Sequence, residues 1–165
     1  MNHKTLILSE KQIQHKIRRI AFQILEFYDG NKELIIAGIA DNGFIFAEKL
    51  VENIKAISDV HPKLCEMKID KKEPYITPEI SLEEREYKGQ SLVLADDVLN
   101  TGSTLIYAVK HLLETDLKEL KTAVLIDRSH KKFPIKADFK GLSLSTSLNE
   151  TVNVSFDKSP KAVLF

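Results

Sequence analysis

The sequence predicts an α/β protein with a doubly wound, mostly parallel sheet and a small β-rich hood at its C-terminal end. Short continuous apolar runs alternate with segments whose apolar residues recur at helical spacing. This alternation is typical of strand–helix–strand units with right-handed crossovers. Residues from about 128 to 165 break it, because short β-like pieces there are separated by turn residues, and they predict the hood.

Size and composition fit one domain over residues 1–165, since a chain of this length buries about two thirds of its unfolded surface. The sequence has 24 Lys and Arg residues and 24 Asp and Glu residues, so its net charge does not indicate a nucleic-acid or membrane partner. A local basic patch is still compatible with this composition. The single Cys65 fits a reducing compartment. No signal-peptide core or membrane-length apolar run is present, and we expect a cytoplasmic protein without a membrane partner.

The N-terminal part predicts an edge strand, a helix and a buried strand. Thr5–Leu8 is a short apolar segment that suits a sheet edge. Ser9 and Gln12 form a capping box, and apolar residues then recur at helical spacing as far as Asp29-Gly30. Leu34–Ile39 is almost entirely apolar, as in a strand buried on both faces.

The next segments predict a loop at Ala40–Gly43, a helix and a third strand at Lys63–Ile69. Residues 70–90 are polar and contain two prolines. A segment this long without a predicted element is usually a lid or binding loop in a compact domain. We therefore expect a flexible lid at about residues 70–90. Further strands are predicted at 92–95 and Thr122–Ile126, with β-like pieces at 138–139, 143–145 and 151–156.

The clearest functional signal lies at residues 92–104, Leu-Val-Leu-Ala-Asp-Asp-Val-Leu-Asn-Thr-Gly-Ser-Thr. An apolar strand ends at Asp96 and Asp97, and the small-residue segment 100–104 leads into a helical pattern. Backbone N–H groups and the helix dipole bind phosphate at such a point. Carboxylates at the carboxyl end of a strand can accept hydrogen bonds from vicinal sugar hydroxyls. The pattern predicts a ribose 5-phosphate site, although a solvated acidic turn or a simple helix cap would explain either half alone.

Residues 92–104 resemble the phosphoribosyl diphosphate (PRPP) motif of type I phosphoribosyltransferases. The segment 127–147, which begins Asp-Arg-Ser-His, closely resembles the bifunctional pyrimidine operon attenuators that are also uracil phosphoribosyltransferases. Residues 17–21 and 37–39 line up with the same family. The resemblance covers nearly the whole chain except a shortened 70–90 region, and it implies a PRPP-binding core whose hood holds the nucleobase.

The resemblance implies that Asp96 and Asp97 bind the ribose hydroxyls and are catalytic together with Arg128. Asp127 would lie with Arg128 near the magnesium pyrophosphate and would be the metal site, with Mg²⁺ as cofactor; without the resemblance, this pair suggests an ion pair at a strand end. Three sets complete the implied site: Val98, Leu99, Asn100, Thr101, Gly102, Ser103 and Thr104 for PRPP; Ala40, Asp41, Asn42 and Gly43 for pyrophosphate; Lys136, Ala137, Asp138 and Phe139 for the base.

Asn100 narrows the choice of base. The related enzymes for 6-oxopurines usually carry a third acid at this position, which can take a proton from the purine, whereas an amide cannot. Together with the attenuator-like tail, this predicts transfer of ribose 5-phosphate from PRPP to a pyrimidine, with uracil giving UMP and pyrophosphate. A phosphoribosyltransferase for another base stays open.

The chain departs from its relatives at residues 40–43, where the family usually has Lys-Thr-Arg-Gly and this sequence has Ala-Asp-Asn-Gly. Losing two charge-assisted hydrogen bonds could cost about 3–6 kcal/mol, so weak activity is expected unless Lys71 or Lys72 supplies charge. The alternative is a weakly or non-catalytic regulator that binds RNA. Relatives form dimers or higher assemblies, and their RNA-binding face matches Arg18, Arg19, His130, Lys131 and Lys136, although Leu142 replaces a usual Lys.

Overall fold

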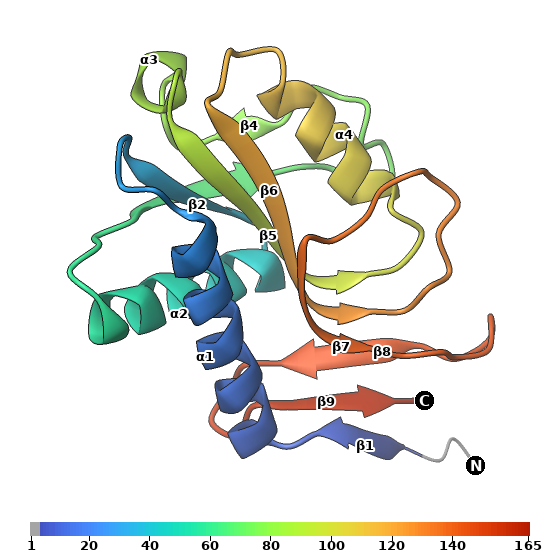
Figure 1. Cartoon of the computed structure of the whole chain (residues 1–165). Coiled ribbons are helices and arrows are strands. Elements are labelled where there is room, and N and C mark those ends of the chain that lie inside the picture. Colours follow the sequence, from blue (N-terminus) through green and yellow to red (C-terminus); the bar gives the residue numbers. More distant parts are fainter. Residues whose placement is uncertain (1–3) are drawn as a thin grey trace.

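A six-stranded sheet forms the centre of the protein in a computed structural model that describes residues 4–165 (Figure 1). Its strand order is β4-β3-β2-β5-β6-β7, and every neighbouring pair is parallel except the pair of β3 and β4. The predicted fold class is confirmed. The strands are β2 (Leu34–Ile39), β3 (Lys63–Lys68), β4 (Glu79–Ile80), β5 (Ser91–Leu99), β6 (Glu119–Asp127) and β7 (Phe139–Ser143).

Helices cover both faces of this sheet. Helices α1 (Glu10–Phe27) and α2 (Asn42–Ile57) pack on the face that carries Ile36, and α4 (Ser103–Leu112) packs on the face that carries Ile35. Successive side chains of a strand point to opposite faces, so a strand between two helical layers must be apolar at every position. This is why β2 and the first half of β5 are continuous apolar runs.

Helix α1 begins at the predicted capping box. The backbone N–H of Gln12 donates to Ser9 Oγ over 3.3 Å, and the N–H of Ser9 donates to Gln12 Oε1 over 2.9 Å. Four isoleucines at helical spacing then face the sheet and are buried. The helix ends at Phe27, close to the expected boundary. No helix among residues 4–165 combines the length and apolarity needed to cross a membrane.

A second sheet, antiparallel and three-stranded, has the order β1-β9-β8. It joins β1 (Thr5–Leu8), which is an edge strand as expected, to β8 (Val152–Ser155) and β9 (Lys161–Leu164). The hood therefore differs from the prediction of a unit built from residues 128–165 alone. It takes one strand from the N-terminal end, and β7 instead extends the central sheet beside β6. Periodicity predicts that a segment is extended but does not say which open sheet edge it pairs with.

The segment 70–90 is only partly a loop. Residues 79–80 form β4 against β3, and α3 (Glu84–Tyr87) buries the Tyr87 side chain in the core beside α4. The expectation of one long segment without regular structure is therefore wrong for its second half, because elements of two and four residues are too short to show a period. The expectation that the N-terminus lacks a signal-peptide core concerns a stretch that includes residues 1–3, and these lie outside the residues that the structure describes.

The packing of α2 leads to a stability prediction. Phe46 of α2 is 0% exposed, whereas Phe22 of α1 is 44% exposed. We expect Phe46→Ala to lower the free energy of unfolding by about 3–5 kcal/mol, because it opens a cavity in a close-packed core. The matched control Phe22→Ala should cost less than about 1 kcal/mol. Urea denaturation followed by circular dichroism measures both values, and equal losses would contradict this assignment of the core.

Candidate functional site at the carboxyl edge of the central sheet

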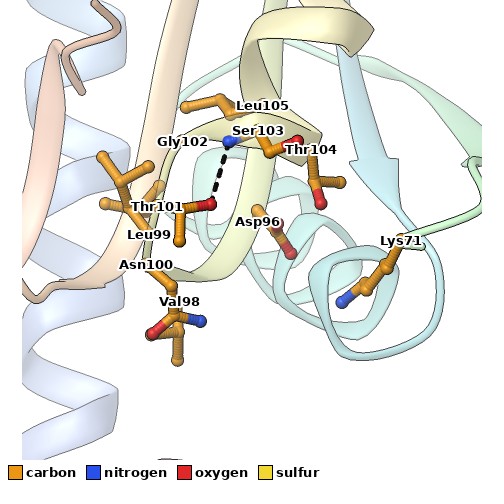
Figure 2. Close-up of a pocket in the computed structure, with 11 residues that line it drawn as sticks. Lys71, Asp96, Val98, Leu99, Asn100, Thr101, Gly102, Ser103, Thr104 and Leu105 are labelled. Atoms are coloured by element: carbon orange, nitrogen blue, oxygen red, sulfur yellow. Dashed lines mark hydrogen bonds between the residues drawn. The ribbon is translucent and has the colours of Figure 1, made fainter. Parts of the chain in front are cut away.

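Two cavities lie at the carboxyl ends of β2, β3 and β5. The first is lined by Lys71, Asp96, Val124 and residues 98–105 (Figure 2). The second is lined by residues 40–42, Lys68, Ile69, Lys71 and Asp97. The predicted PRPP segment and the predicted pyrophosphate loop are therefore neighbours, and Lys71 belongs to both cavities. Ligands of open α/β sheets bind at this edge, outside the carboxyl ends of the strands.

The two adjacent acids of β5 point to different sides of the sheet. Asp96 continues the row of Leu92 and Leu94, which faces α4, and Asp97 continues the row of Val93 and Ala95, which faces α1 and α2. Each acid consequently lines a different cavity. The sequence predicted both acids at one site but could not show that the end of β5 separates them.

Asp96 is a buried acid whose side chain has little access to water, since the residue is only 5% exposed. Its Oδ1 accepts the backbone N–H of Asp97 over 2.9 Å. Burial raises the pKa of Asp96 well above its ordinary value, the neighbouring charge of Asp97 raises it further, and the nearby Lys71 opposes these effects. Perturbed acids of this kind mark functional sites more often than structural ones.

The predicted phosphate loop leads directly into α4. Gly102 has the left-handed φ of +86° and caps the helix, so that the first N–H groups of α4 have no partner within the helix. A Cβ on Gly102 would lie 2.4 Å from Ile135 Cγ2, which adds a steric reason for glycine. The carbonyl of Thr101 accepts the N–H groups of Lys132 and Phe133, so the chain after β6 packs behind the loop.

The predicted pyrophosphate loop contains a cis peptide between Ala40 and Asp41 and opens α2. Gly43 lies so close to Asp96 that an added Cβ would sit 2.7 Å from Oδ1. Asn42 has a role that the sequence did not reveal: its Nδ2 donates to the carbonyl of Val154 over 2.8 Å and to Asp97 Oδ2 over 3.4 Å. The amide thereby joins the loop, the acid of β5 and the hood.

Arg128 connects the phosphate loop to the hood. Its guanidinium is buried, and it donates to Asn100 Oδ1 over 3.0 Å and to Thr146 Oγ1 over 2.9 Å. A further N–H donates to the carbonyl of Glu150. Arg128 does not line the cavity of the pyrophosphate loop. Its catalytic role stays a prediction, and the contacts point to positioning of the two segments that it joins.

The carboxylate of Asp127 is already paired. Oδ1 accepts the N–H of Ser129 over 3.0 Å, and Oδ2 lies 3.3 Å from Lys131 Nζ and 3.9 Å from Lys140 Nζ. Asp127 therefore forms an ion pair at the end of β6, as the sequence suggested, but its partners are these lysines and not Arg128. Residues 4–165 contain no group of three or more His, Cys, Asp or Glu side chains that could hold a metal. As arranged, Asp127 does not fit a direct metal ligand, because a cation would have to displace two lysines.

The predicted base-binding residues 136–139 are held beside β6. Thr122 Oγ1 donates to the carbonyl of Lys136 over 2.8 Å, and the N–H of Thr122 donates to Asp138 Oδ2 over 2.9 Å. Ala137 is buried, and the ring of Phe139 packs 6.0 Å from that of Phe27. None of the four lines either cavity. Their role in binding the base stays a prediction.

The burial of Asp96 leads to a prediction about stability. A group whose folded-state pKa is raised contributes stability that is fully present below its unfolded pKa, here near 3.8, and that is lost as the pH rises through the folded pKa. Asp96→Asn does not titrate and keeps an oxygen for the Asp97 N–H. We expect the stability of the variant to match that of the wild type near pH 4 and to exceed it at pH 8.

Chemical denaturation at the two pH values measures this difference. Asp59→Asn, at an exposed carboxylate between α2 and β3, is the matched control and should show no such gain. A loss of stability at pH 8 in Asp96→Asn would contradict the account of a buried acid whose charged form is disfavoured.

Comparisons with known proteins agree with this fold. The sequence model of the phosphoribosyl transferase domain matches residues 5–158. The Bifunctional protein PyrR of Brevibacillus brevis is 35% identical over 163 residues, which are 93% of this chain and 90% of that protein. The protein of the same name from Bacillus subtilis strain 168 is 32% identical over 168 residues, with 96% of this chain and 93% of that protein covered.

A solved structure shares the fold. The hypoxanthine-guanine phosphoribosyltransferase of Bacillus anthracis has a TM-score of 0.77 at 20% identity, with 96% of each chain covered. The resemblance found in the sequence, to type I phosphoribosyltransferases and to the bifunctional attenuators among them, is confirmed. The chain belongs to the phosphoribosyl transferase domain family.

Proposed function

We propose that the protein transfers ribose 5-phosphate from PRPP to uracil. The observation that carries this proposal is the cavity in which Asp96, the N-terminus of α4 and Asn100 meet. The helix N-terminus suits the 5-phosphate and the acids suit the ribose hydroxyls. Asn100 stands where the purine enzymes usually have a proton-accepting acid. The similarity to the PyrR proteins supports a pyrimidine, whereas the structural likeness to hypoxanthine-guanine enzymes bears on the fold.

The residues of the site would act mainly by alignment and fixed charge. The phosphate loop and the acids of β5 hold the ribose, and Lys71 places a cation between the two cavities, next to the departing pyrophosphate. We propose that Mg²⁺ enters with PRPP, since this ion binds phosphate oxygens and keeps most of its waters, and that it supplies positive charge to the leaving group.

A pyrophosphate-release assay tests the proposal directly. Purified protein receives PRPP, magnesium and one base at a time: uracil, cytosine, hypoxanthine, guanine or adenine. We expect the largest kcat/KM with uracil. Faster turnover of hypoxanthine or guanine would overturn the assignment of the base. The proposed activity would be overturned if none of the five bases gave pyrophosphate release above the rate measured without enzyme.

A second candidate function is an RNA-binding regulator of pyrimidine genes. It is favoured by the arrangement of basic residues, because Arg19 of α1 donates to the carbonyl of Gly141 over 2.7 Å and so brings α1 beside β7. Arg18 next to it lies 5.4 Å from the exposed ring of Phe22. A mobility shift of a pyrimidine leader RNA that weakens with salt, and that Arg18→Ala reduces, would support this function. Binding of unrelated RNA with equal affinity would count against it.

The acids of β5 should be required for PRPP. We expect the double variant Asp96→Asn and Asp97→Asn to fold and to lose PRPP affinity by more than about 100-fold, because the charged acceptors for the ribose hydroxyls are gone. Isothermal titration calorimetry with PRPP and magnesium measures the affinity. Asp59→Asn is the control and should bind like the wild type. Unchanged affinity in the double variant would refute the ribose site.

The loop at residues 40–43 should limit catalysis. We expect Ala40→Lys to raise kcat/KM for PRPP about tenfold, since a cation at the leaving group stabilises charge that grows in the transition state. Asn42 is left in place because its amide holds Val154 and Asp97. The control Ala56→Lys adds the same charge on an exposed position of α2 and should change nothing. If Ala40→Lys has no effect and Lys71→Met abolishes activity, Lys71 already supplies that charge.

A further inference from the structure

We propose that Asn100 selects the base by donating a hydrogen bond from its amide Nδ2 to the carbonyl oxygen next to the attacking nitrogen, which is O2 of uracil. This inference rests on the proposed function and deepens it, because it assigns the atom that is recognised. It also gives Arg128 a role that differs from the catalytic one first expected. Arg128 would be a positioning residue that aims the amide of Asn100.

The contact with Arg128 determines which way the amide of Asn100 points. A guanidinium offers only N–H donors, so the amide atom that lies 3.0 Å from Nη1 must be the oxygen. The two N–H groups of Nδ2 are then directed away from Arg128. Figure 2 shows the amide nitrogen of Asn100 on the side of the loop where Asp96 and Lys71 lie. The cavity therefore presents donors, not an acceptor, at this position.

Arg128 is itself held firmly. It is 9% exposed, and Thr146 Oγ1 accepts from both Nε and Nη2, at 3.2 and 2.9 Å. The carbonyl of Glu150 accepts from it as well. Since these partners belong to the loop that enters β8, Arg128 ties Asn100 of the phosphate loop to the hood, where a base attached to the ribose would be expected.

The chemistry of the transfer favours a base with a carbonyl oxygen at this point. The bond from C1 of the ribose to the pyrophosphate oxygen breaks, and its electron pair leaves with pyrophosphate. The N1 lone pair of uracil forms the new bond to C1, and the N1 proton passes to water, because an amide cannot accept it. Negative charge that develops as the proton departs is shared with O2. A donor on O2 then stabilises this charge more in the transition state than in the ground state.

A 6-oxopurine meets the same amide unfavourably. When it attacks through N9, its N7 carries a hydrogen that must be accepted. The N–H of Asn100 Nδ2 would then face the N7–H of the purine, and neither donor would have an acceptor. A closed site strongly disfavours a ligand that leaves polar groups unpaired in this way. The pair of Asn100 and Arg128 would thus supply both the attraction to uracil and the discrimination against purines.

Thionucleotides test the proposed contact atom by atom. Calorimetry compares UMP with 2-thio-UMP and 4-thio-UMP, because sulfur is a weaker acceptor than oxygen. We expect the wild type to bind 2-thio-UMP about five- to tenfold more weakly than UMP, and Asn100→Ala to bind the two equally. The ratio for 4-thio-UMP should be the same in both proteins. Asn53→Ala, which removes an amide that donates to the Lys49 carbonyl within α2, should behave as the wild type.

Arg128 is tested by the same ratio. Arg128→Lys should bind UMP but lose most of the discrimination against 2-thio-UMP, since a flexible ammonium lacks the planar fork that fixes Asn100 and Thr146 together. In steady-state assays Asn100→Asp should lower kcat/KM for uracil about 100-fold and raise the ratio of hypoxanthine to uracil turnover. Circular dichroism confirms that each variant is folded.

The outcomes separate this inference from the proposed function. If the wild type converts uracil but Asn100→Ala keeps the full 2-thio discrimination, the inference is overturned and the proposed function stands. If the wild type converts no base but binds UMP, the activity is refuted and the thio ratio still decides the role of Asn100. If UMP does not bind at all, both are overturned.

Discussion

The site depends on the burial of β5 between two helical layers. This strand pairs with β2 on one side and β6 on the other, and both of its faces are covered, so its backbone has no freedom to shift. It therefore carries its two acids to the same edge of the sheet, where Asp96 and Asp97 line two neighbouring cavities. Burial at this position raises the pKa of Asp96, and Gly43 leaves room for its side chain. A site built at the end of such a strand is rigid before any ligand arrives.

The hood strands contribute Leu8, Val152, Val154 and Ala162 to the apolar core on the side of α1 and α2, and polar side chains tie the hood to this edge of the sheet. Asn42 joins β8 to the loop before α2, and Arg128 joins the loop before β8 to the phosphate loop. Both links begin at a residue of the site and end on the hood. A movement of the hood would consequently displace the side chains of Asp97 and Asn100. A ligand that orders these residues would also order the hood.

Charge at the site is unevenly placed. The loop at residues 40–43 carries Asp41 and no cation, while Lys71 lines both cavities. Asp127 and its two lysines form a separate cluster at the end of β6. The cations that line the cavity beside the loop at residues 40–43 are Lys68 at the end of β3 and Lys71 in the segment that follows it.

The sequence by itself determined the fold class, the capped first helix, the buried strands and the order of strand, acids, small-residue loop and helix. Each of these depends on local periodicity and capping, which are written in consecutive residues. Only the tertiary structure decided that β1 joins the hood, that β7 extends the main sheet, that Asp96 and Asp97 serve different cavities, and that Arg128 holds Asn100. These features depend on contacts between residues far apart in the chain, and a hydrogen bond from residue 128 to residue 100 leaves no periodic trace in the sequence.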